Sequence, residues 1–160
     1  MLNNIIRTIN FLTLAYVFGS TVWFLFIQSP ALVKRIGRDR FVPLQMSLVG
    51  VLFRSLTAAL LVMTVAALVL EQNVLSGPVL SAATALGGAL INHFFVVPRA
   101  LKHGGRSLRE EVTVDEQKSV SRFASEGGGE ATRFWHRVLV LFVVVTLAGV
   151  VLHAVYLVAG

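Results

Sequence analysis

Two histidines are the residues of this chain with the clearest capacity for metal chemistry. His93 lies near the end of one long apolar segment, and His136 lies at the start of another. If both positions face the same side of a bilayer, the two imidazoles share a depth, which is the minimum for a haem or copper site. No third ligand or methionine partner accompanies them, and His103 and His153 lie elsewhere. We therefore predict no metal and no cofactor, and interpret both residues as interfacial histidines bonded to a carbonyl or headgroup.

Catalytic patterns are equally sparse. The chain has no cysteine, so thiolate sites, disulfides and cysteine nucleophiles are excluded. No Ser/His/Asp arrangement is evident, and the eight acids lie outside the apolar segments or at their edges. Acid–base catalysis and proton-coupled transport both need an ionisable group in the right place. The triplet 127–129, Gly-Gly-Gly, has neither the preceding strand nor the following Lys-Ser/Thr of a phosphate loop. We predict that the protein is not an enzyme.

Polar and small residues inside the apolar segments are the remaining candidates. Arg54 lies within one segment, where it either extends to the headgroups or binds a lipid phosphate or a partner's carboxylate; both interpretations stay open. Asn92 is expected to make an interhelical hydrogen bond worth ~0.6 kcal/mol. Gln45 is expected to act as a similar polar contact. Gly87 and Gly88 belong to a run of small residues, which predicts that this helix is the most enclosed one.

Composition places the chain in a membrane. It has 160 residues, of which 56% are hydrophobic and only 14% are charged. A soluble domain has nearer a quarter of charged residues. The net charge of +6 comes from basic residues between apolar segments rather than on one face of a soluble domain. The pattern is typical of membrane topology and excludes a nucleic-acid partner.

The elements that must position these residues are four transmembrane helices. Each apolar segment is long enough to cross a ~30 Å hydrocarbon core. We predict an all-α four-helix bundle in one transmembrane domain over 1–160, with a polar loop containing a short amphipathic helix from about Leu108 to Phe123. The spans are approximately 8–28, 43–70, 76–98 and 137–159, and the loop covers 99–136. Pro30 and Pro98 are expected to end their helices, and Pro43 to open the second span.

Charge predicts the orientation. With Arg54 counted at the basic side, every lysine and arginine except Arg7 lies with the two long connections. By the positive-inside rule these connections face the cytoplasm or the mitochondrial matrix, and both termini lie opposite. The residues expected to contact lipid headgroups or a partner are Lys34, Arg35, Arg38, Arg40, Arg54, Arg99 and Trp135.

Several motifs resemble one known family. They are Gly19, Val22-Trp23, Phe26, Pro30 and Leu32, then Arg40-Phe41, Gln45 and Phe53, with Asn92 before Pro98-Arg99 and Phe134 before His136. This pattern is similar to the transmembrane protein 205 family, small four-span proteins whose members largely share a domain of unknown function. Gly50, Leu52, Leu139 and Val143 depart from it, where the family tends to have Pro, Tyr, Ser and Asn. The resemblance implies a fold and an association with drug or metal tolerance, but no reaction.

Two functions remain open from the sequence. The first is a structural or accessory subunit of a larger membrane complex, with bound phospholipid and other membrane subunits as partners. A mitochondrial inner membrane, in a respiratory or energy-converting assembly, is favoured over plasma membrane or endomembrane. The alternative is a small transporter or a membrane factor for drug or metal tolerance, using polar residues near one interface.

Overall fold

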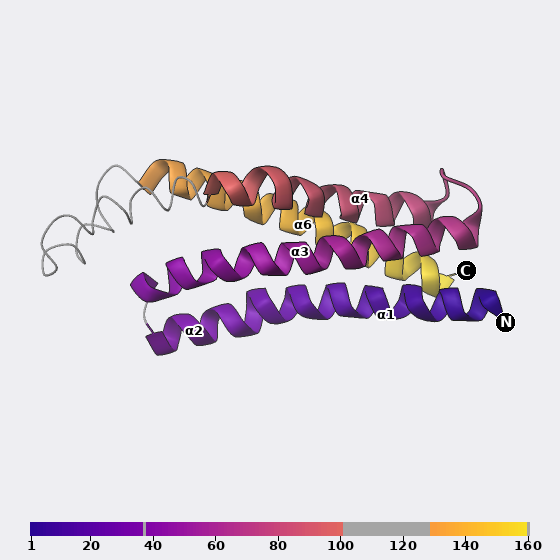
Figure 1. The fold of residues 1–160 in the computed structure, drawn as a ribbon, viewed down its shortest axis with the longest axis horizontal. Coiled ribbons are helices and arrows are strands. Elements are labelled where there is room, and N and C mark those ends of the chain that lie inside the picture. The colour runs from indigo at the N-terminus through magenta and orange to yellow at the C-terminus, as the bar shows by residue number, and fades with distance from the viewer. Residues whose placement is uncertain (37, 101–128, 160) are drawn as a thin grey trace, which may run out of the picture.

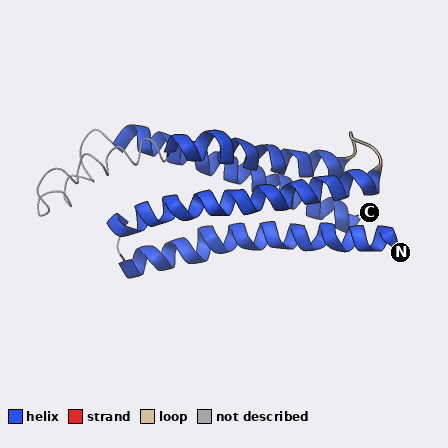
Figure 2. Cartoon of the chain, viewed as in Figure 1, coloured by secondary structure: helices blue, strands red, loops and turns tan. Residues whose placement is uncertain are grey.

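The computed structural model shows a bundle of long helices lying side by side (Figure 1). It describes residues 1–36, 38–100 and 129–159, excluding the side chains of 38–44, 46, 47, 129–133 and 136. Its elements are α1 (Leu2–Val22), η1 (Trp23–Gln28), α2 (Ser29–Ile36), α3 (Arg38–Glu71), α4 (Gly77–Ile91), η2 (Asn92–Val96) and α6 (Gly129–Ala159). Strands are absent from these parts of the chain (Figure 2). The predicted loop helix 108–123 lies outside the described residues.

Four continuous helical segments, which we call rods, are long and apolar enough to cross a membrane: Leu2–Ile36, Leu48–Glu71, Gly77–Ala100 and Arg137–Ala159. The prediction of an all-α, four-span membrane bundle is therefore confirmed. The third rod has the largest buried share, 44% of its most apolar window, as its small residues predicted. Both termini and the turn after α3 lie at one end of the bundle, which we call the terminal end (Figure 1). The opposite end, where α2 ends and α3 begins, is the basic end.

The prediction that prolines 30 and 98 end their helices was wrong. The first rod continues through Pro30 to Ile36, and the third continues through Pro98 to Ala100. In each, a wide π-helical turn lies immediately before the proline: η1 ends two residues before Pro30, and η2 ends two residues before Pro98. A proline cannot donate to the carbonyl four residues earlier, and its ring clashes with that carbonyl. A widened turn moves the carbonyl aside, so the helix survives.

The second rod also begins earlier than expected. α3 starts at Arg38, so Pro43 lies in its second turn rather than its first. α3 ends at Glu71, and Gln72 takes the left-handed conformation (φ 53°) that usually closes a helix with glycine. The Gln72 amide donates to the Leu68 carbonyl at 3.0 Å, and the Asn73 side chain accepts from the Leu75 amide at 3.0 Å. Pro78 then occupies the first turn of α4.

Contacts between the rods are unequal. α4 packs extensively on α6, and α3 packs on both α1 and α4, whereas α1 and α6 share much less contact. The core runs the length of the bundle and includes Leu14, Val17, Leu56, Leu60 and Met63. Many apolar side chains on the outer faces remain exposed, as expected for helices surrounded by lipid. The weak contact between α1 and α6 leaves room for a site.

Candidate functional site: an apolar groove between α1 and α6

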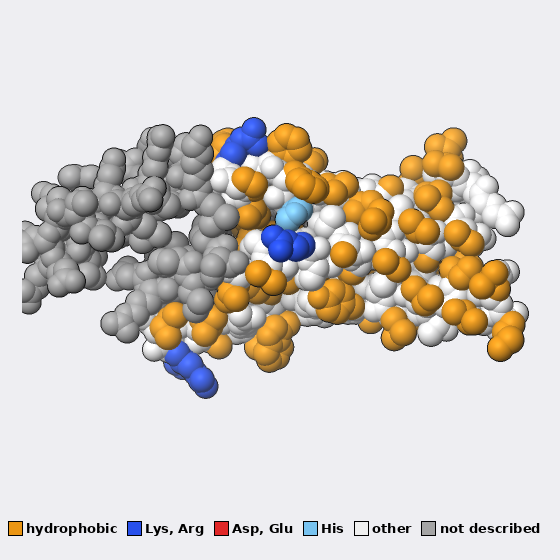
Figure 3. Space-filling model, viewed as in Figure 1, with side chains coloured by type: hydrophobic (Ala, Val, Ile, Leu, Met, Phe, Trp, Pro, Cys, Tyr) orange, Lys and Arg blue, Asp and Glu red, His pale blue; other side chains and the backbone are white. Residues whose placement is uncertain are grey.

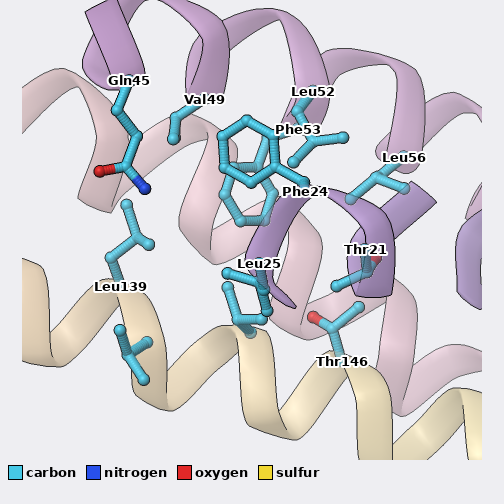
Figure 4. A pocket seen from close by; sticks show the side chains of 12 residues that line it. Thr21, Phe24, Leu25, Gln45, Val49, Leu52, Phe53, Leu56, Leu139 and Thr146 are labelled. Atoms are coloured by element: carbon cyan, nitrogen blue, oxygen red, sulfur yellow. The ribbon is translucent and has the colours of Figure 1, made fainter. Parts of the chain in front are cut away.

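A groove lies where α1 and α6 separate, toward the basic end. Its cavity is small, about 50 Å³, and opens at a mouth on the surface of the bundle. Its lining comes from the first rod, α3 and α6, and consists of Thr21, Phe24, Leu25, Gln45, Val49, Leu52, Phe53, Leu56, Leu139, Val140, Val143 and Thr146. Figure 4 shows Gln45 and Leu139 at one end of the groove and Thr21 and Thr146 at the other. The groove therefore runs along the helices.

The hydroxyl groups in this groove do not make it polar. Thr21 donates to the Val17 carbonyl at 2.7 Å, and Thr146 donates to the Phe142 carbonyl at 2.8 Å. Each threonine hydroxyl has one donor, and that donor is bonded to a carbonyl of its own helix. Apart from Gln45, the other lining side chains are hydrocarbon or aromatic. Such a surface offers mainly hydrocarbon contacts.

The widened turn η1 shapes the wall of the groove. Its Phe24 and Leu25 project into the lining, and Phe24 is buried. The Ser29 hydroxyl donates to the Phe24 carbonyl at 2.6 Å, five residues back, and the Ser29 amide donates to the same carbonyl. Gln45 donates from α3 to the Ser29 hydroxyl at 3.3 Å. The predicted polar contact at Gln45 therefore ties α3 to the start of α2, at the outer end of the groove.

Basic residues continue beyond this outer end. Lys34 and Arg35 are exposed in the last turn of α2. The side chains of Arg38 and Arg40, expected at the same headgroup level, lie outside the described residues. The outer end of the groove therefore lies near cationic side chains, which can contact an anionic phosphate.

Arg99 and Trp135 lie together at the basic end. The Arg99 guanidinium donates to the Phe95 carbonyl at 3.1 Å and lies 5.4 Å from the Phe95 ring centroid and 5.8 Å from that of Trp135. Phe134 packs edge-on against Trp135 at 5.4 Å. Arg99 therefore joins the end of the third rod to the start of α6 through cation–π contacts.

Asn92 occupies the predicted structural role. It is fully buried, and its amide donates to the Leu139 carbonyl of α6 at 3.3 Å. His93 is half-buried, packs edge-on against Phe94 at 4.6 Å, and has no partner at Nδ1. The side chain of His136, the other member of the expected pair, lies outside the described residues. Within the described residues, no group of three His, Cys, Asp or Glu side chains could hold a metal.

The two glycines of α4 differ. A Cβ on Gly88 would lie 2.7 Å from the Thr146 hydroxyl and 3.2 Å from the Phe142 carbonyl, so α6 packs directly on this residue. A Cβ on Gly87 would meet no atom within 4 Å, so the packing role expected there has no contact among the described residues. Gly149 of α6, which the sequence did not single out, packs directly against the backbone of α4. Its Cβ would lie 2.7 Å from the Ala85 amide nitrogen and 2.8 Å from the Ser81 carbonyl.

A buried polar cluster at the terminal end was also missed. It joins Asn10 of α1, Pro78 and Ser81 of α4, and His153 of α6. His153 is 0% exposed and Asn10 1% exposed. The imidazole Nδ1 lies 2.9 Å from the Pro78 carbonyl and 3.4 Å from the Ser81 hydroxyl, and Nε2 lies 3.1 Å from Oδ1 of Asn10. We call this arrangement the terminal clamp.

Hydrogen-bond chemistry defines the states of the clamp. The Pro78 carbonyl only accepts, so Nδ1 of His153 carries a proton. In a charged imidazole Nε2 donates to Oδ1 of Asn10, which leaves Nδ2 of Asn10 without a partner. In a neutral imidazole the amide reverses and donates to Nε2. Asn10 can therefore join α1 to α6 in either state.

A sequence signal for the clamp did exist. Asn10 and His153 are uncharged polar residues, each inside an otherwise apolar span and each about two to three turns from its terminus. Once both termini are placed on one side, the two residues fall at a similar depth. Buried polar residues in lipid require partners, so matching depths could have paired them.

Comparison with known proteins identifies the first part of the chain. The domain of unknown function DUF4149 matches residues 12–103, more than half of the protein. This chain belongs to the DUF4149 family. No curated protein and no solved structure matches it.

The DUF4149 match divides the site. The α1 and α3 walls of the groove, from Thr21 to Leu56, lie within the matched residues, and the α6 wall lies beyond them. Asn10 and His153 both lie outside the match, whereas Pro78 and Ser81 lie inside it. The groove and the clamp of this DUF4149 protein are thus completed by residues outside the shared domain.

Proposed function

We propose that this DUF4149 protein is a non-catalytic integral membrane protein that holds a phospholipid acyl chain in the α1–α6 groove and serves as an accessory subunit of a larger membrane assembly. The observation that carries the proposal is the groove itself. Its two threonine hydroxyls are bonded to their own helices, so it offers hydrocarbon contacts to an occupant.

The length of the groove supports an acyl chain lying along it. From Gln45 to Leu56 it extends about 16 Å along α3. That length is close to one leaflet of a ~30 Å hydrocarbon core. Gln45 and the exposed Lys34 and Arg35 lie toward the outer end, where the glycerol and phosphate of a phospholipid would emerge. An acyl chain seated this way keeps its headgroup at the basic interface.

Filling the groove tests lipid binding. Val140 lines the groove and is 41% exposed, so Val140→Trp fills the mouth with little demand on the core. Each methylene displaced from apolar contact costs ~0.8 kcal/mol, so loss of two contacts reduces retention of phospholipid by about tenfold. Native mass spectrometry of protein extracted in mild detergent measures the fraction carrying lipid.

Val144→Trp is the matched control. Val144 lies one turn along the same helix, is 56% exposed, and does not line the groove. It should retain phospholipid like the unmodified protein. Equal lipid content in both tryptophan variants, or no bound phospholipid in the unmodified protein, would contradict acyl-chain binding in the groove.

The accessory role follows from what the site can do. A groove that binds hydrocarbon and a bundle held by packing supply a scaffold, and a scaffold acts through proteins assembled on it. We place the basic end in the cytoplasm or mitochondrial matrix and favour the mitochondrial inner membrane, since the basic residues gather at that end. Native electrophoresis of gently solubilised membranes tests the role. Migration in a large assembly is expected, and migration only as a monomer or small homo-oligomer would refute it.

A closer kinship is part of the same proposal. The motifs that resemble the transmembrane protein 205 family, from Gly19 to Phe53, fall inside the DUF4149 match. The structure gives one of them a physical role, because Pro30 follows the widened turn that shapes the groove. We therefore infer that this chain and that family share the first two helices and the turn between them.

A further inference from the structure

Arg54 is exposed in the middle of α3, inside the span Leu48–Glu71. It lies about 9 Å along the helix from the basic end of that span. Among the described residues it has no hydrogen bond or ion pair, and Glu71 stands at the far end of the same helix. An unpaired cation at this depth is costly in lipid, which marks it as a site for an anion.

The surface around Arg54 is smooth and apolar. Gly50 and Ala58 lie one turn before and one turn after it, on the same face of α3. A Cβ on Gly50 would meet no atom within 4 Å, so nothing in the described bundle requires a glycine there. Glycine in a helix costs up to ~1 kcal/mol relative to alanine. Small residues on an outward face permit a second helix to approach closely.

A second polar group lies at the same depth on the neighbouring rod. His93 is about 10 Å from Ala100, the basic end of the third span, and η2 contacts α3. Its Nδ1 is buried without a partner. Figure 3 shows a histidine beside a basic side chain, with hydrophobic side chains around them. The face thus combines a cation with an imidazole, well below the headgroup level.

We propose that the Gly50–Arg54–Ala58 face of α3 is the contact surface for a transmembrane helix of a partner protein that carries a carboxylate at the depth of Arg54. The small residues favour this occupant over a lipid, because a phosphate needs only an extended arginine, whereas a helix needs the close approach that Gly50 and Ala58 permit. The charges are complementary, and the small residues accommodate a helix. This inference rests on the proposed accessory role and names the kind of partner.

The test uses the full chain reconstituted in phosphatidylcholine vesicles with a synthetic Leu/Ala transmembrane peptide. The peptide carries a Glu ~9 Å from each end of its apolar segment, so either insertion direction presents one at the right depth. A second peptide has Gln at both positions. Energy transfer between labelled protein and labelled peptide measures association. The Glu peptide should associate at least tenfold more strongly than the Gln peptide, and Arg54→Gln should abolish this difference.

Arg99→Gln is the matched control, because Arg99 lies near the same end but is bonded to the Phe95 carbonyl. It should keep the preference for Glu. Equal association of the two peptides, or a preference that persists in Arg54→Gln, would overturn the proposal. A lipid outcome would also overturn it. In that outcome the native protein binds phosphatidylglycerol in mixed vesicles and does not associate with the Glu peptide, and Arg54→Gln no longer binds phosphatidylglycerol. Failure of the accessory role would appear separately, as a lone monomer in native membranes.

Discussion

The terminal and basic halves of the bundle pack their helices differently: the terminal half is closely packed, and the basic half contains a groove. At the terminal end, α6 lies against the backbone of α4 at Gly149 and is bonded to α1 through His153 and Asn10. At the basic end, α1 and α6 part around a groove, and both rods that contain a late proline widen into a π turn.

The difference shows which features close a membrane bundle and which leave it open. Small residues and buried polar bonds draw helices together where no water drives them. Bulky residues such as Phe24 and Phe53, set on a widened turn and its neighbour, hold the helices apart at the groove. The closely packed terminal half can then position the helices that line the groove.

The largest expected effect comes from overpacking the contact between α4 and α6 in the terminal half. Gly149→Ala places a Cβ within 2.9 Å of backbone and side-chain atoms of α4, which cannot move aside cheaply. We expect a loss of about 2 kcal/mol in the free energy of unfolding, measured by denaturant titration in mixed micelles. Gly87→Ala is the control, because its Cβ enters open space. That change should be neutral or stabilise the helix by up to ~1 kcal/mol. Similar losses in both variants would show that close packing of α4 and α6 is not what holds this half.

A smaller effect is expected from breaking the terminal clamp. Asn10→Leu and His153→Leu each remove one side of the 3.1 Å contact between α1 and α6. A double-mutant cycle on the free energy of unfolding should give a coupling of ~1 kcal/mol, within the range found for polar contacts in membranes. Asn10→Leu combined with His93→Leu should show no coupling, since His93 lies in the other half. Additive effects for Asn10 and His153 would rule out the clamp as a link between these helices.

The smallest effect concerns the widened turn. Pro30→Ala restores an amide donor and removes the ring clash, so the turn over Trp23–Gln28 can tighten into regular α-helix. Amide hydrogen exchange in this segment should slow by a few-fold, with little change in overall stability. Pro78→Ala is the control, because a proline in the first turn of α4 displaces no helical bond. Unchanged exchange around residue 30 would mean that the proline does not impose the wide turn.

The four apolar helices could be predicted because the length and composition of an apolar segment are local properties. The four rods, the enclosed third helix, and the interhelical bond of Asn92 follow from such properties. The continuation through Pro30 and Pro98 could not be foreseen, because a proline is equally compatible with a helix end and with a widened turn. Context decides between them, here with Ser29 bonding back to the Phe24 carbonyl.

The site itself was only partly visible in the sequence. Gln45 was singled out for its polarity, but the apolar residues that line the groove resemble every other residue that faces lipid. Gly149 stands among valines, without a small residue four positions away to suggest a packing motif. His153 and Asn10 are 143 positions apart, so their pairing depends on the fold. Tertiary placement, rather than residue type, separates these residues from their neighbours.

The terminal clamp holds the first rod near one end only, so the rod can tilt about that point. The fixed point is Asn10, and the first rod continues from there through η1 to Gln28, about 27 Å away, with α3 on one side and the groove on the other. A tilt of about 5° about this fixed point displaces the far tip by roughly 2 Å while the near contacts barely shift. Insertion of a hydrocarbon tail would therefore be felt most at the tip, beside Lys34 and Arg35, and least where the two ends of the polypeptide emerge.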